Sequence, residues 1–183
     1  ATRRTPEAKL LEPLFDRYMS PMLKFVETLD DHVMEVPMTC RVQTTLNLLG
    51  ALLAESVNAA VVLPPVHIEC VFLFCLTWGI GGTLEASGRK SFHGELGKLS
   101  SLVPNDSDEQ TMFDYCLSPS ADWETWHDYA EDIEQDSATI SAGASQQPFV
   151  FTGEMTCATF LLDALTKSGT HANAMIVGHS GVG

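Results

Sequence analysis

Apolar residues recur every three or four positions through residues 8–30, and this spacing predicts an amphipathic helix. Pro13 and Pro21 lie inside the same stretch, so we expect the helix to be kinked or divided there because proline removes a backbone donor. The stripe is typical of core packing. Its apolar members are Leu11, Leu14, Phe15, Tyr18, Met22, Phe25, Val26 and Leu29.

Three further helices are predicted before residue 100. Helical spacing of valine and leucine through residues 41–57 predicts a helix that follows Pro37. The pair Pro64-Pro65 marks a turn before a strongly apolar helix at about 66–78. A polar stretch at 89–96 predicts a fourth, shorter helix.

The pattern changes after residue 100. The run TMFDYCL at 111–117 is short, aromatic and bounded by turn residues, which favours a strand. Residues 122–147 are acidic at first and then small and polar, and their second half reads as a linker of low order. An extended segment at 147–155, a helix around 160–165 and the strand AMIV at 174–177 follow. The sequence therefore predicts a mainly α fold with a small β element, followed by the opening of an α/β unit.

Charge and composition limit the classes of partner that the chain can have. The chain of 183 residues carries 24 acidic and 10 basic side chains, for a net charge of -14. Such a surface repels phosphate backbones, so nucleic acid is excluded as a partner. The apolar run VHIECVFLFCLTWGIGG contains Glu69 and is too short to span a bilayer. It therefore predicts a buried helix, and we expect no membrane partner.

Cysteine and histidine usage indicates neither disulfides nor a metal site. The five cysteines are odd in number and form no C-x-x-C pair, which is typical of free buried thiols in a reducing compartment. No signal peptide pattern opens the chain, so a cytoplasmic location is expected. The histidines at 32, 67, 93 and 127 lack metal-ligand spacing. Acidic runs at 30–31 and 131–136 read as solvated faces.

The chain ends on AMIVGHSGVG, which has two functional interpretations. In the first, Ser180 is the nucleophile of a G-x-S-x-G turn in a serine hydrolase. Val182 stands where that motif has glycine, and the base would be His127 or His171, both of which precede the serine. The motif predicts the opposite order, so an ordinary loop residue is the stronger interpretation of Ser180.

In the second interpretation the same residues begin a phosphate-binding loop, G-x-x-x-x-G-K-[ST]. Gly178 and Gly183 have the required spacing, and the predicted strand AMIV precedes them. Backbone N–H groups of such a loop hold phosphate oxygens, and the following helix adds its positive N-terminus. The lysine and the magnesium-binding hydroxyl belong at the two positions after Gly183. A plain strand-to-helix turn stays open as a third interpretation.

The order of segments resembles the dynein heavy chain, a ring motor of six ATPase-type modules, over nearly the whole chain. LFDRYMSPMLKFV at 14–26 looks like the family's helix after a module core. FLFCLTWGIGGTLEASGRKSF at 72–92 is similar to a family helix with phenylalanines, a tryptophan, a double glycine and then an arginine before phenylalanine. TMFDYC resembles the family's V-F-D-Y segment, Trp126 the tryptophan after it, and MIVGHSGVG the family's M-I-V-G-x-x-G-x-G.

The resemblance implies a domain plan. Residues 1–130 would be the helical AAA+ small (lid) subdomain that closes the second ring module. Residues 131–148 would be an acidic, polar linker, and 149–183 the start of the third P-loop ATPase module, truncated after the glycine loop. The sequences of the F-D-Y and W-G-I-G-G segments resemble those of axonemal dyneins more than those of cytoplasmic dyneins.

The resemblance also implies a nucleotide site. The phosphates of ATP or ADP with Mg would lie in the loop, and the base would lie beside the segment 150–152. The implied contacts are Gly178, His179, Ser180, Gly181, Val182, Gly183, Val150, Phe151 and Thr152. Phe151 stands where the family has proline, Met155 replaces a threonine and Cys157 an arginine, and these departures weaken the site. Arg89 is a candidate phosphate sensor, with a surface charge as the simpler interpretation.

The resemblance therefore implies a fragment of an ATP-driven microtubule motor in the cytoskeleton of a cilium or flagellum. Its partners would be neighbouring ring modules, microtubules and other dynein subunits. We expect no catalytic residue and no bound cofactor in the fragment itself, since it lacks the lysine, the hydroxyl and the acidic residues of later strands. The alternatives are a serine hydrolase and a non-enzymatic helical interaction domain.

Overall fold

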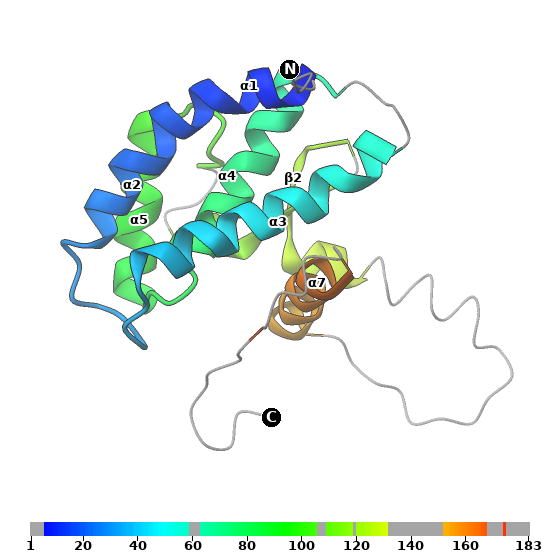
Figure 1. Cartoon of the computed structure of the whole chain (residues 1–183). Helices are drawn as coiled ribbons and strands as arrows, with labels where there is room; N and C mark the ends of the chain where they lie inside the picture. Colours follow the sequence, from blue (N-terminus) through cyan, green and yellow to red (C-terminus); the bar gives the residue numbers. More distant parts are fainter. Residues whose placement is uncertain are drawn as a thin grey trace, which may run out of the picture.

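The computed structural model describes residues 6–58, 63–105, 109–118, 120–131, 152–167 and 174. In this part of the chain the helical segments between residues 6 and 99 form a bundle, a two-stranded hairpin lies against it, and the helix at 153–167 packs on the outside (Figure 1). The mainly α fold with a small β element is confirmed.

The first predicted helix is divided into three parts. It comprises α1 (Pro6–Leu14), the π-helix η1 (Phe15–Met19) and α2 (Ser20–Val26). Pro13 lies inside α1 and Pro21 in the first turn of α2, so the π-helix lies between the two prolines. Proline has no backbone N–H to donate, and the wider π-helical turn accommodates the hydrogen bonds that are missing there. The expected interruption is confirmed, and its π-helical form is a finding of the structure.

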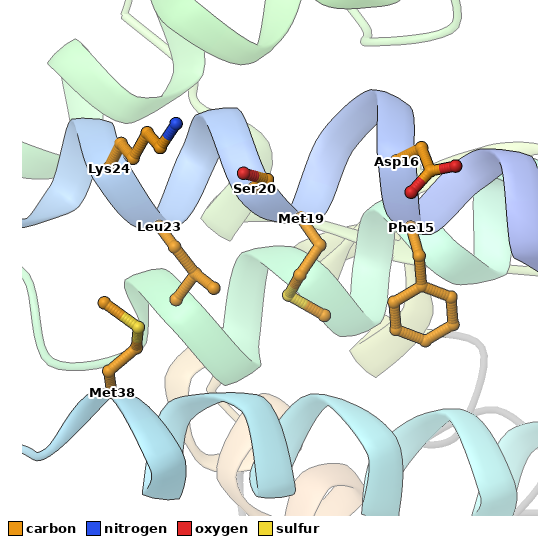
Figure 2. Close-up of a pocket in the computed structure, with 7 residues that line it drawn as sticks. All are labelled: Phe15, Asp16, Met19, Ser20, Leu23, Lys24 and Met38. Carbon is orange, nitrogen blue, oxygen red and sulfur yellow. The ribbon is translucent and has the colours of Figure 1, made fainter.

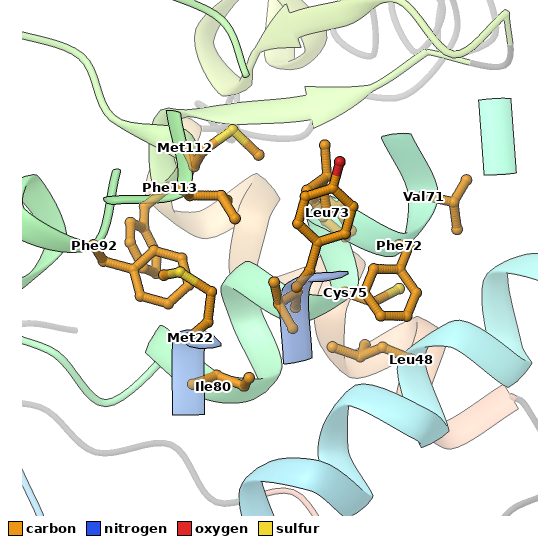
Figure 3. Close-up of a cluster of buried hydrophobic side chains, with 14 of the residues drawn as sticks. Met22, Leu48, Val71, Phe72, Leu73, Cys75, Ile80, Phe92, Met112 and Phe113 are labelled. Atoms are coloured by element: carbon orange, nitrogen blue, oxygen red, sulfur yellow. The ribbon is translucent and has the colours of Figure 1, made fainter. Parts of the chain in front are cut away.

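The centre of the bundle is the pair α3 (Met38–Asn58) and α4 (Pro65–Gly81). From Val71 to Thr77 every residue of helix α4 is buried, and Phe72, Leu73 and Leu76 are fully enclosed. Figure 3 shows its side chains between residues of α2, α3, α5 and the 112–113 turn. Among the described residues, no helix combines the length and apolarity needed to cross a membrane.

Close packing of α3 on α4 depends on Gly79. A Cβ atom at this position would lie 2.7 Å from the Cα and the backbone nitrogen of Thr45. Thr45 is itself fully buried, and its hydroxyl donates to the carbonyl of Arg41 on the preceding turn at 3.0 Å. The two helix backbones can therefore approach only because residue 79 has no side chain.

After α5 (Ala86–Leu99) the chain forms the predicted β element. A short 3₁₀ turn, η2 (Met112–Asp114), leads into β1 (Tyr115–Leu117), which pairs antiparallel with β2 (Trp123–Thr125). Thr111 and Asp114 form a reciprocal capping box at the start of η2. Residues 126–131 are helical. Strand β2 and this last helix lie in the stretch for which the sequence pattern predicted neither.

The hairpin loop contains the one non-glycine residue with positive φ in the described chain, Ala121, at φ 67°. The left-handed conformation crowds the Cβ atom of an L-residue, and glycine avoids this cost. We expect Ala121→Gly to raise the free energy of unfolding by up to about 1 kcal/mol, since the added freedom of the unfolded chain offsets part of the gain. Urea unfolding monitored by circular dichroism checks this, and a lower midpoint would contradict it.

Helix α7 (Gly153–Lys167) packs on the outside of the body beside α3 (Figure 1). Its buried residues Thr156 and Cys157 face inward, and Phe160, Leu161 and Ala164 pack against the main core. The helix itself was expected around 160–165, and it extends about two turns further toward its N-terminus. The domain boundaries at 130 and 149 stay a prediction.

Candidate functional site

Of the predicted nucleotide contacts, Thr152 alone lies in the described part of the chain. Its hydroxyl accepts a hydrogen bond from the Met155 amide at 3.3 Å, and its carbonyl accepts one from the Thr156 amide at 2.9 Å. Thr152 thus caps the start of α7. Val150, Phe151 and residues 178–183 lie outside the described residues, so the loop and its serine stay predictions.

Four rings from three segments meet where α7 contacts the body, and we call them the aromatic junction: Phe74, Trp126, Tyr129 and Phe160. The ring centroid of Phe160 lies 5.8 Å from that of Phe74 and 5.6 Å from that of Trp126. The Tyr129 ring lies 6.3 Å away, nearly perpendicular. Edge-to-face contacts at these separations are favourable beyond the burial of area.

Trp126 anchors the aromatic junction to the body. Its side chain is 5% exposed, and the indole N–H donates to the carbonyl of Phe113 at 3.0 Å. Gly153 at the start of α7 lies so near that a Cβ atom there would be 3.3 Å from the Cβ of Trp126. The close backbone approach at Gly153 therefore holds α7 at its N-terminal end, next in sequence to the predicted base contacts, and the ring contacts hold it at Phe160 in its middle.

Two thiols lie at the same contact and are inert. Burial raises the pKa of Cys157 on α7 to about 12, and burial also raises the pKa of Cys116 on β1 to about 12. Neither forms the thiolate needed for nucleophilic or redox chemistry near neutral pH. All five cysteines are free, and four are buried as expected, whereas Cys40 is exposed.

Arg89, the candidate sensor, is packed on aromatic rings. Its guanidinium lies 4.8 Å from the centroid of Phe113 and 5.9 Å from that of Trp78. Its Nε donates to the carbonyl of Leu84 at 3.0 Å. The simpler interpretation of a solvated surface charge does not describe it, since the stacking orients the guanidinium. The sensing role stays a prediction.

One turn further along α5, His93 lies half-buried with its Nδ1 enclosed and without a hydrogen-bond partner among the residues that the structure describes. Burial lowers the pKa of His93, and the Asp114 carboxylate opposes this only in part. The native state therefore holds His93 neutral where the unfolded chain already binds a proton.

This difference predicts a pH dependence. The pKa of His93 is depressed in the native state. Its contribution to the free energy of unfolding is therefore fully present above the pKa of the unfolded chain, about 6.5, and is lost as pH falls below that value. We expect the drop in unfolding free energy between pH 7.5 and 5.5 to be smaller in His93→Gln than in the wild type. Chemical denaturation at both pH values measures this, and an equal drop would contradict it.

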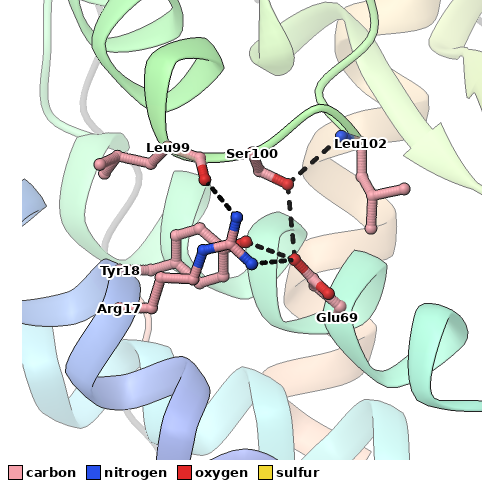
Figure 4. Close-up of polar contacts among 6 residues, drawn as sticks. All are labelled: Arg17, Tyr18, Glu69, Leu99, Ser100 and Leu102. Atoms are coloured by element: carbon pink, nitrogen blue, oxygen red, sulfur yellow. Dashed lines mark hydrogen bonds and ion pairs between the residues drawn. The ribbon is translucent and has the colours of Figure 1, made fainter.

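A carboxylate inside the apolar helix α4 organises a second polar cluster (Figure 4). Glu69 Oε1 accepts hydrogen bonds from the hydroxyls of Tyr18 and Ser100, and Arg17 pairs with it at 3.5 Å. Arg17 also donates to the carbonyl of Leu99 at the end of α5 at 2.7 Å. Burial, followed by the Glu69 contact, raises the pKa of Tyr18. The cluster joins η1, α4 and α5 and is structural.

A shallow apolar groove of about 240 Å³ lies between η1–α2 and the start of α3 (Figure 2). Thr152, the predicted nucleotide contact that the structure describes, does not line it. In the described part of the chain no group of three or more histidine, cysteine or acidic side chains is arranged to hold a metal ion. The lining residues are Phe15, Asp16, Met19, Ser20, Leu23, Lys24 and Met38.

Comparison with known families identifies the helical body. The sequence model of the dynein heavy chain AAA lid domain matches residues 11–128, from the first helix of the bundle to the helix that carries Trp126. The chain belongs to the dynein heavy chain family. Both the resemblance found in the sequence and the helical lid fold are therefore confirmed, and α7 lies beyond the matched segment.

Curated dynein relatives agree with this assignment. The dynein gamma chain of the flagellar outer arm from Chlamydomonas reinhardtii is 31% identical over 126 residues, which is 68% of this chain. The dynein-1-beta heavy chain of the flagellar inner arm I1 complex from the same alga is 34% identical over 63% of this chain. Dynein axonemal heavy chain 11 from Sus scrofa is 27% identical over 99% of this chain. The chain spans only 2–4% of the length of these relatives.

Proposed function

We propose that this chain is the lid of one ring module joined to the opening of the next in an ATP-driven microtubule motor of the axonemal type. The family assignment of residues 11–128 carries the proposal. The names of the relatives, which include flagellar outer-arm, flagellar inner-arm and axonemal heavy chains, support an axonemal location in the cytoskeleton.

The proposed role of the lid is to hold the first helix of the following module. Helix α7 is fixed by the aromatic junction and by the close approach of Gly153 to Trp126. In the sequence, α7 is followed by the AMIV segment and the glycine loop. Any shift of the lid would thus reach the nucleotide loop through a helix of 15 residues.

The proposed nucleotide site belongs to the intact parent. Backbone N–H groups of residues 178–183 would hold the phosphates, and residues 150–152 would contact the base. Chemistry would further require the lysine and the hydroxyl at the two positions after Gly183, together with acidic residues from later strands. A relative that aligns over 99% of this chain supports extension of the family resemblance through the loop.

Nucleotide and fluorophosphonate assays test this proposal on the purified chain. We expect no ATP hydrolysis above background and no rise of the melting temperature with millimolar ATP-Mg, since the purified chain does not contain the lysine that follows the glycine loop in the motif. A clear thermal shift would contradict this. A fluorophosphonate probe should leave Ser180 unmodified, and stoichiometric labelling of Ser180 would favour the serine hydrolase instead.

A further inference from the structure

The connection between α2 and α3 is clamped onto the turn between α4 and α5. His32 forms a β-bridge with Leu84, and the Val33 amide donates to the carbonyl of Thr83 at 2.9 Å. The Glu85 amide donates to the carbonyl of Asp31 at 3.0 Å. Four helices therefore meet at this connection.

Arg41 lies at the centre of the clamp and is only 8% exposed. Its Nη1 donates to the carbonyl of Ile80 near the end of α4 at 2.6 Å, and its Nε donates to the carbonyl of Val36 at 3.2 Å. Its Nη2 lies 3.3 Å from His32 Nδ1. Burial lowers the pKa of Arg41, and the nearby Glu27 carboxylate opposes that shift. The guanidinium nevertheless stays charged at every accessible pH.

The partners of His32 dictate its protonation state. A guanidinium can only donate hydrogen bonds, so His32 Nδ1 must be an unprotonated acceptor. On the other side of the ring, Nε2 lies 3.3 Å from the carbonyl of Val26, which can only accept, so Nε2 must carry the hydrogen. The clamp is therefore complete only when the imidazole is neutral and is the Nε2–H tautomer.

No ion pair to a carboxylate stabilises a second proton on the His32 ring in the described part of the chain. In the described ranges, no carboxylate lies within 4.0 Å of the His32 ring. On the neighbouring segments, the Asp31 carboxylate accepts from Ser87 at 2.8 Å and Arg89 donates to the Leu84 carbonyl. The Glu27 carboxylate interacts electrostatically with Arg41. Asp30, Glu35 and Glu85 make no ion pair with the His32 ring. A proton on Nδ1 would thus place two cations against each other.

We propose that His32 and Arg41 form a proton-sensitive latch that holds the connection 27–37 against the α4–α5 turn. When His32 gains a proton, Nδ1 becomes a donor that faces the donor Nη2, and the imidazolium must leave its position. Arg41 then loses one of its three partners, and the bond that holds the ring to the end of α2 is broken. The latch is closed while the imidazole is neutral and opens when the imidazole gains a proton.

Amide hydrogen exchange on the full chain tests the latch. With intrinsic rates corrected, exchange of residues 27–37 in the wild type should accelerate as pH falls, by up to about tenfold per unit below the onset of opening. His32→Gln, which cannot gain a proton, should abolish this acceleration. His93→Gln is the matched control, because it removes a different histidine and should leave the local acceleration unchanged.

A second measurement covers a variant that loosens the connection at every pH. Nitrogen-15 spectroscopy of the wild type at neutral pH should show His32 as the Nε2–H tautomer. Detection of the Nδ1–H tautomer would overturn the proposal, as would equal pH dependence of exchange in the wild type and His32→Gln.

Discussion

Gly79→Ala is expected to lower the free energy of unfolding by about 3 kcal/mol, the upper range for overpacking of a tight core. The added Cβ would lie 2.7 Å from the Cα and nitrogen of Thr45. These are backbone atoms of the helix turn at Thr45, whose own side chain is fully buried, so the clash cannot be relieved without separating α3 from α4. The lost free energy comes from packing contacts made by both α3 and α4.

Gly50→Ala is the matched control, since Gly50 lies on α3 and a Cβ there would meet nothing within 4 Å. Alanine favours the helix, so this variant should gain about 0.5–1 kcal/mol. The two variants are compared by urea unfolding. The unfolding is followed by circular dichroism at 222 nm, a signal that reports helical content. A midpoint of Gly79→Ala equal to that of the wild type would contradict the close crossing.

Trp126→Ala is expected to cost about 3–5 kcal/mol, the range for deleting a buried aromatic side chain. The substitution removes the ring contacts to Phe74 and Phe160 and the hydrogen bond to the Phe113 carbonyl. Because Phe160 is the centre of the α7 contact, the amides of α7 should lose protection from hydrogen exchange before those of α4. Exchange mass spectrometry resolves the two helices.

Trp126→Phe separates the ring from the hydrogen bond. It keeps an aromatic side chain in the junction and loses the indole donor, so we expect a cost of about 1 kcal/mol and α7 still protected. If α7 and α4 in Trp126→Ala lose protection together and only on global unfolding, the aromatic junction is not what holds α7.

The helices of the body could be predicted because their apolar residues repeat at helical spacing and because Pro37 and Pro64 mark where two of them begin. Even α4, which is buried around its whole circumference in its central turns, could be recognised from its apolarity and length. Its single carboxylate, Glu69, was a signal for a partnered polar group, since a buried charge requires donors. The identity of those donors depends on tertiary contacts.

The hairpin and the site were less predictable, for physical reasons. Strand β2 has three residues and forms only through pairing with β1, so no local periodicity marks it. The capping box of Thr111 and Asp114 was a usable local signal for the turn before β1. The surface on which the apolar side of α7 packs cannot be read from its sequence, and nor can the stacking of Arg89 on Phe113.

The central claim is that residues 178–183 are the phosphate loop of a dynein module whose lid-bound first helix is α7. Sequencing the parent transcript beyond the codon of Gly183 tests it most directly. The account predicts lysine at the next position, followed by threonine or serine. A stop codon, or a residue without positive charge at that position, would contradict it.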